Sequence, residues 1–285
     1  MSIKNKALLV NLKISQMSGF KIDKGATEQV ALTNNSSMEA GRYNKNLFAS
    51  TDLLSNIKSK TNDIRKKFYH NTLPWGLKGT HMLPSANFMD FSAEFRADKK
   101  DWFSLVDEFI VGIPKIKVDA PRVLGKMYNE ADYPTEEEAR ARFSMDMEIT
   151  SIPDDDFRVQ GISEDELDTI RKDITNKVTT ATEDAMNVAW QRLYDTVSHM
   201  AETLADPAKN FKNTLVENTQ DICSVLTRLN VTDDPNLERL RQEVEASLTT
   251  THPEVLRHDP DARRDTAEDA KAIMDKMGSF MRGGN

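Results

Sequence analysis

Two stretches of the chain alternate apolar and polar residues, which is the period of a half-buried β-strand. The first is residues 7–14 (ALLVNLKI), and the second is residues 143–151, which begin FSMDMEI. A turn with Pro153 and three aspartates follows, so residues 156–160 can return beside the second strand as a hairpin. We therefore expect a small antiparallel sheet of three strands that connects the N-terminal part of the chain to its middle.

Apolar residues spaced by three and four predict amphipathic helices in the N-terminal half. One helix is expected over residues 51–69 and another over residues 85–110. Residues 73–84 (LPWGLKGTHMLP) lie between them and contain two prolines and two glycines, so we expect a loop there. We expect Pro114 and Pro121 to break the chain after the second helix into a connector.

The strongest helical pattern begins at a capping box, Ser163 to Glu166, and continues to about residue 205. Its apolar positions are Leu167, Ile170, Ile174, Val178, Ala181, Ala185 and Val188, then Leu193, Val197, Met200 and Leu204. A helix over residues 163–205 would be about 60 Å long, at about 1.5 Å per residue. Two interpretations stay open: a spine within one chain, or a coiled-coil contact between subunits of an oligomer.

Further helices are predicted over residues 208–229 and 235–248, and residues 249–253 are expected to form a linker. The last segment, residues 260–282, is amphipathic and rich in methionine near its end. Such a helix can dock on a protein partner, or it can fold back on its own chain.

The predicted fold class is therefore α+β, mainly helical, with a small antiparallel sheet and a long central helix. We expect three consecutive parts. Residues 1–162 form a basic N-terminal lobe with the sheet, residues 163–248 form the long helix and a helical array, and residues 249–285 form a linker and a tail helix.

Composition supports a helical protein, and we expect it in the cytoplasm. Charged residues make up 29% of the chain, and there are only 11 glycines and 10 prolines. No apolar run approaches the roughly 20 residues of a membrane span, and the first residues lack the pattern of a signal peptide. The single cysteine, Cys223, excludes an intramolecular disulfide and fits a reducing compartment.

Charge is distributed unevenly along the chain. Residues 1–81 hold 13 Lys and Arg against 5 Asp and Glu, although the whole chain has a net charge of −8. Aromatic residues are interleaved with these cations, and single-stranded nucleic acid is bound by cations that contact phosphates and rings that stack on bases. The candidate nucleic-acid-binding residues are Arg42, Tyr43, Lys45, Arg65, Lys66, Lys67, Tyr69, Trp75 and Lys78. The alternative is that the lysines near residue 66 are only the solvated face of an amphipathic helix, and that Trp75 is buried.

Recognisable catalytic signatures are missing from the sequence: it has no nucleotide-binding glycine loop, no HExxH, no CxxC and no GxSxG. We therefore predict no catalytic residues, no cofactor and no metal site. A metal-dependent enzyme such as a nuclease would require the acids at 154–156 to converge with a histidine such as His70 or His81.

Several segments resemble an uncharacterised family of bacteriophages and prophages whose domain has no assigned function. They are AGRYNKNLF (40–48), HNTLPWG (70–76), MLPSANF (82–88), NEADYP (129–134), PDDDFRV (153–159) and RLNVTDDP (228–235). This resemblance covers about residues 7–248 and implies a phage source. A small sheet with a basic helical lobe and a long helix is also similar in outline to phage single-strand annealing proteins, which is an analogy of fold alone.

The sequence therefore predicts a phage-encoded, oligomeric protein that binds single-stranded nucleic acid and assists annealing in DNA recombination or replication. The alternative is a non-enzymatic assembly subunit, adaptor or inhibitor whose basic lobe binds an acidic protein partner. In both cases we expect no membrane contact, and the C-terminal helix is a possible site for a protein partner.

Overall fold

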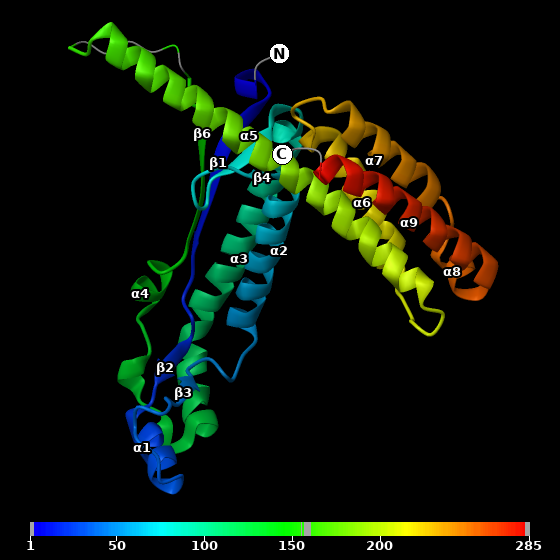
Figure 1. The fold of residues 1–285 in the computed structure, drawn as a ribbon. Coiled ribbons are helices and arrows are strands. Elements are labelled where there is room, and N and C mark those ends of the chain that lie inside the picture. Colours follow the sequence, from blue (N-terminus) through cyan, green and yellow to red (C-terminus); the bar gives the residue numbers. More distant parts are fainter. Residues whose placement is uncertain (1–2, 155, 157–160, 283–285) are drawn as a thin grey trace. The chain divides into compact units, whose positions relative to one another are not determined.

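The computed structural model describes residues 3–154, 156 and 161–282, and it has the predicted fold class, α+β and mainly helical (Figure 1). Its α-helices are α1 (Lys24–Thr33), α2 (Leu53–Asn71), α3 (Ser85–Leu124), α4 (Glu136–Arg140), α5 (Glu164–Ala205), α6 (Thr214–Leu229), α7 (Pro235–Leu248), α8 (Pro253–His258) and α9 (Pro260–Arg282). Its strands are β1 (Ala7–Ser15), β2 (Phe20–Ile22), β3 (Asn44–Asn46), β4 (Leu73–Pro74), β5 (His81–Pro84) and β6 (Ser144–Ser151).

The larger sheet has the strand order β4-β5-β1-β6. The predicted strands at 7–14 and 143–151 are therefore confirmed as members of one sheet. The expected loop at 73–84 is wrong, because β4 and β5 form an antiparallel hairpin there and β5 pairs with β1. Gly76 and Gly79 both have positive φ angles, which glycine adopts without a Cβ penalty, and they make the hairpin turn. Of the hairpin strand expected at 156–160, residues 157–160 lie outside the described residues.

Helix α3 continues through Pro114 and Pro121, so the predicted connector is wrong. Both prolines lie on the exposed side of the helix, and buried side chains such as Ile113 and Leu124 extend its apolar face beyond them. A proline inside a helix costs about 3 kcal/mol relative to alanine. Burial of the apolar face offsets that cost, because each buried aliphatic side chain contributes about 1.5–3 kcal/mol.

The chain divides into two compact units, each built from separate segments. Unit 1 is Met1–Asn11, Phe68–Phe91 and Glu148–Asn285, and unit 2 is Leu12–Lys67 and Ser92–Met147. This division differs from the three consecutive parts expected from the sequence, because strands and helices run from one unit into the other.

The core of unit 1 forms around the second half of α5. Side chains from Ala181 to Leu204 pack with those of α6, α7 and α9 (Figure 1). In this half α5 is the spine of its own chain, one of the two interpretations of the long helix. Helix α9 buries Ile273 and Met277 in the same core, so the tail folds back on its own chain. In contrast, none of the side chains described between residues 168 and 180 is buried.

Unit 2 has an aromatic core in which α2 and α3 participate. The Phe109 ring makes edge contacts with Phe48 at 5.0 Å and with Phe143 at 5.8 Å between centroids. Trp102 is fully buried, and its indole Nε1 donates a hydrogen bond of 2.7 Å to Oγ1 of Thr61. The described helices include none that is both long and apolar enough to cross a membrane.

Candidate nucleic-acid interface

Two of the lysines on α2 are held by carboxylates of α3. Lys67 Nζ lies 2.8 Å from Glu94 and 2.9 Å from Asp98, and Lys60 Nζ lies 2.7 Å from Asp98. Burial alone would raise the pKa of Asp98, but the hydrogen bonds from Lys60 and Lys67 outweigh it, and its pKa lies below the usual value. Lys67 was a candidate phosphate contact, and these two ion pairs stabilise the packing of α2 on α3 instead.

Lys45, another candidate, lies inside unit 2 with a side chain that is only 5% exposed. Its ammonium group is 2.8 Å from Asp23 and 2.7 Å from Asp132, and it also donates to the Met127 carbonyl oxygen. Burial would lower the pKa of Lys45, but hydrogen bonds to Asp132 and then to Asp23 raise it above the usual value. Lys45 is therefore a buried structural cation, and the prediction that it contacts phosphate is not supported by its position.

The cations that stay accessible on α2 are Arg65 and Lys66. Arg65 makes no hydrogen bond or ion pair with the described residues, and the Lys66 side chain is 81% exposed with Asp63 only 3.9 Å away. A contact that long between two exposed groups contributes little. Arg42 is also exposed, without a partner in the described part of the chain. These three are free to bind an anion.

Two exposed aromatic rings lie on the small β2–β3 ribbon or beside it. Tyr43 directly precedes β3 and is 41% exposed. Phe20 begins β2, is 53% exposed, and has the Lys58 ammonium 5.2 Å from its ring centroid. Phe20 was missed in the sequence analysis, although the short alternation of apolar and polar residues at 20–22 is the signal that could have found it. An exposed ring beside a cation suits base stacking.

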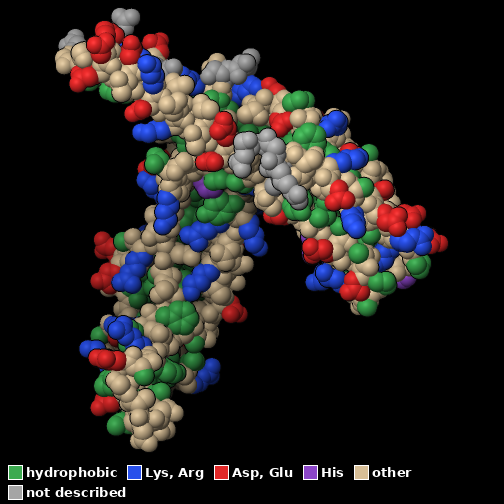
Figure 2. Space-filling view, viewed as in Figure 1, with side chains coloured by type: hydrophobic (Ala, Val, Ile, Leu, Met, Phe, Trp, Pro, Cys, Tyr) green, Lys and Arg blue, Asp and Glu red, His purple; other side chains and the backbone are tan. Residues whose placement is uncertain are grey.

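The charge asymmetry of the sequence is weaker in the folded units. Unit 2 holds 19 Lys and Arg against 17 Asp and Glu, whereas unit 1 holds 19 against 29. The acids of α3 and α4 thus balance most of the cations in the N-terminal segment. Figure 2 shows Lys and Arg side chains along the surface formed by α2 and α3, and Asp and Glu side chains gathered at the N-terminal end of α5.

The other three candidates belong to unit 1. Tyr69 is exposed, and its ring lies 5.2 Å from that of His81. Burial and then the nearby Arg192 lower the pKa of His81, which favours a neutral imidazole. Lys78 is exposed in the β4–β5 turn. Trp75 is buried with 6% exposure, which is the alternative interpretation given above.

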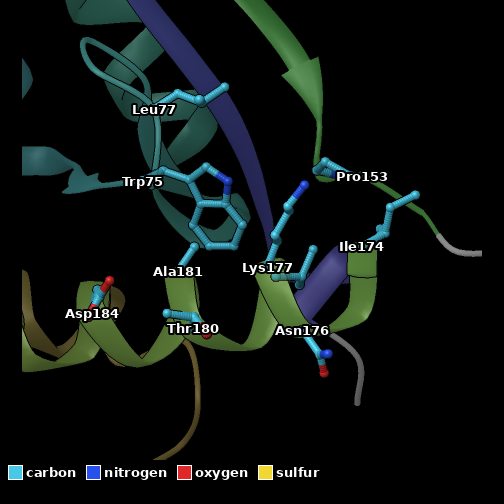
Figure 3. A pocket seen from close by; sticks show the side chains of 11 residues that line it. Trp75, Leu77, Pro153, Ile174, Asn176, Lys177, Thr180, Ala181 and Asp184 are labelled. Atoms are coloured by element: carbon cyan, nitrogen blue, oxygen red, sulfur yellow. The ribbon is translucent and has the colours of Figure 1, made fainter. Parts of the chain in front are cut away.

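Trp75 borders a pocket of about 710 Å³ between the β4–β5 turn and the first half of α5 (Figure 3). Its α5 lining includes Ile174, Lys177, Val178, Ala181 and Asp184. Ile174, Lys177, Ala181 and Asp184 are spaced by three or four, so they lie along one side of the helix. The lining is mostly apolar, and its polar side chains on α5 are those of Asn176, Lys177, Thr180 and Asp184.

No group of three or more potential metal ligands is present among the described residues. His70 instead lies 3.3 Å from Asp221, and Asp155 lies outside the described residues. Cys223 is buried, and burial raises the pKa of its thiol to about 12, so it is not a nucleophile at neutral pH.

Comparison of the chain with family models, curated proteins and solved structures found no match.

Proposed function

We propose that this protein is a phage-encoded, oligomeric binder of single-stranded nucleic acid, acting as an accessory in DNA annealing, recombination or replication. The observation that supports this best is that unit 2 carries both uncompensated cations and exposed aromatic rings. Arg42, Arg65 and Lys66 would contact phosphates, and Phe20 and Tyr43 would stack on unpaired bases. Neither kind of contact requires a particular base sequence.

Lys45 and Lys67 are left out of this interface, since their ammonium groups are held by carboxylates. Tyr69 and Lys78 of unit 1 are exposed and stay as further candidate contacts. The phage source rests on the resemblance of the sequence segments alone.

The test is fluorescence anisotropy of a labelled single-stranded oligonucleotide at several salt concentrations. Changing Arg65→Glu and Lys66→Glu together should weaken binding at least tenfold. It should also lower the slope of log affinity against log salt by about 1.4, because each phosphate contact on a single strand contributes about 0.7. The control is Lys172→Glu with Lys271→Glu, which changes the net charge equally at exposed positions of unit 1. Equal binding by the two double variants would contradict the interface.

A second candidate is supported by a different observation, the exposed apolar side chains around α1. Val30, Leu32 and Met38 are all exposed there, and a nucleic-acid interface does not require exposed aliphatic side chains. Such a patch suits a protein partner. An adaptor or assembly subunit would be indifferent to oligonucleotides even at low salt, and Leu32→Asp would then abolish its complex with the partner without affecting folding.

A further inference from the structure

The polar groups that border the Trp75 pocket have no partners in the described part of the chain. The most informative is the Trp75 indole N–H, because the residue is 6% exposed and the nitrogen nevertheless makes no hydrogen bond to a described residue. By contrast, Trp102 donates to Thr61 at 2.7 Å and Trp190 donates to Asp234 at 3.0 Å. The indole nitrogen is not one of the fully enclosed polar atoms that lack a partner, so its N–H opens to the pocket. A molecule bound in the pocket can therefore accept a hydrogen bond from Trp75.

Two charged groups define the remaining chemistry of the pocket. Lys177 and Asp184 lie on α5 seven residues apart, about two turns, and neither forms an ion pair with the described residues. In Figure 3 the Trp75 ring lies between Leu77 and Ala181, with the Lys177 side chain on the side of its indole nitrogen and Asp184 on the other side. An occupant would meet an apolar surface, an N–H donor, a cation and a carboxylate.

We propose that this pocket binds a single nucleotide unit, either one residue of a single strand or a free nucleotide. The base would lie against the apolar side chains of α5, with one of its acceptor atoms on the Trp75 indole N–H. Asp184 would accept a hydrogen bond from a base amino or ring N–H group, and Lys177 would pair with the phosphate. The choice of ligand rests on the proposed function, whereas the pocket and its unpaired groups do not.

A nucleotide fits better than an apolar peptide because it can pair with the indole N–H, Lys177 and Asp184 together. The pocket volume lies within the range of about 300–1,000 Å³ that is usual for small-ligand sites. Gly76 brings the turn close to α5, since a Cβ at that position would lie 3.7 Å from the Ala181 Cβ. Trp75 and Ala181 belong to the same buried cluster, so only a small part of Trp75 is open to the pocket. A purely apolar side chain would leave Lys177 and Asp184 unused.

The test is titration of tryptophan fluorescence with adenosine 5′-monophosphate and, separately, with a single-stranded oligonucleotide of mixed sequence. Either ligand should quench the wild-type signal, and the change should be absent in Trp75→Phe, which keeps an aromatic ring but lacks the N–H. Lys177→Gln should weaken binding about tenfold, because a charge-assisted contact is lost. The matched control is Lys172→Gln, an exposed lysine of α5 outside the pocket. Circular dichroism of each variant checks that the fold is kept.

The outcomes separate this inference from the proposed function. The oligonucleotide could bind without quenching Trp75 fluorescence, and with the same affinity for the Lys177→Gln variant. That result would overturn the pocket inference and leave the unit 2 interface intact. Quenching by the mononucleotide, together with no effect of the Arg65 and Lys66 changes on oligonucleotide binding, would support the pocket and contradict the interface. Quenching by a peptide with phenylalanine between aspartates, but by neither nucleotide ligand, would overturn the nucleotide assignment in favour of a protein partner.

Discussion

Individual lysines of the basic segment have different roles according to what surrounds them. Lys45 is held between Asp23 and Asp132, whereas Lys66 is exposed to solvent and its ammonium group lies 3.9 Å from Asp63. Removing one member of a buried ion pair leaves the opposite charge uncompensated, and that is more costly than losing an exposed pair. A substitution at Lys45 should therefore change stability, whereas a substitution at Lys66 should change binding, although both lysines belong to the same basic segment.

Lys45→Met should lower the free energy of unfolding by roughly 3 kcal/mol, because two carboxylates lose the cation between them. Urea denaturation at neutral pH measures this, with Lys66→Met as the control that should change stability by under about 0.5 kcal/mol.

The hydrogen bond from Lys45 lowers the pKa of Asp23, and hydrogen bonds from Lys21 and Lys45 outweigh burial to lower the pKa of Asp132. A carboxyl group whose pKa is lowered by folding stabilises the fold at pH values above its ordinary pKa of 3.8. This stabilisation is lost as the pH falls through the lowered pKa. The difference between variant and wild type should therefore shrink in acid, and equal stability at neutral pH would contradict this role.

At the scale of elements, α3 depends on its packing more than on its local sequence. Pro114 has no N–H to donate to the Ile110 carbonyl oxygen, and its ring crowds that carbonyl group. The helix nevertheless continues to Leu124, because Ile113 and Ile116 are buried in the core of unit 2. Helical propensity alone predicts a break, and burial prevents it.

Pro114→Ala should therefore stabilise the protein by about 1 kcal/mol or more, since the helix interior regains a hydrogen bond without losing any buried side chain. Thermal unfolding followed by circular dichroism gives the comparison, with an expected rise in the midpoint. Pro121→Ala, one turn from the end of α3, is the control and should have a smaller effect. A lower midpoint for Pro114→Ala would indicate that the proline is required for the shape of the helix.

The element with two distinct halves is α5. Its second half is buried in unit 1. After the buried Leu167, the apolar residues of its first half are exposed or half-buried, with Ile170 37% exposed. The pattern continues through both halves at a nearly constant spacing, so the sequence alone does not distinguish them. The exposed half is the part of α5 left for a contact between subunits.

At the scale of the whole molecule, the proposed oligomer would assemble through that exposed half. Light scattering of the purified protein should give a mass above the 32.3 kDa of one chain. At the same concentration, the mass of the Ile170→Lys variant should fall toward that of one chain. Thr169→Lys adds the same charge at the adjacent exposed position, on another face of the helix, and should leave the mass unchanged. A wild-type protein that stays monomeric at every concentration would rule out the oligomer.

The charge of the whole molecule is also decided by folding. The N-terminal segment is strongly basic in sequence, yet its lysines at positions 45, 60 and 67 meet carboxylates from residues 94–132. Unit 2 as a result has only a small excess of cations. The attraction of this unit for an anionic strand should therefore come from a few exposed side chains, and each of these phosphate contacts should add about 0.7 to the slope of log affinity against log salt.

The sequence by itself determined the elements whose apolar spacing is long and regular. Residues 163–205 gave the long helix with its Ser163 cap, and the alternation at 7–14 gave β1. The fold class follows from these, because each pattern spans enough residues to outweigh local exceptions. Arg42, Tyr43, Arg65 and Lys66 were also named as candidates from the sequence, and the first two and Lys66 are exposed, whereas Arg65 is half-buried.

Only the tertiary structure decided which neighbours each residue has. Strands β4 and β5 are too short to show a period, and they form because β1 pairs with β5. Lys45 meets Asp132, which is 87 residues away along the chain, and Trp75 meets α5 across a similar distance in sequence. Hydrophobic periodicity reports which face of an element is buried, whereas ion pairs and pockets depend on contacts between distant segments. For that reason the pocket beside Trp75 and the loss of Lys45 from the candidate interface required the fold.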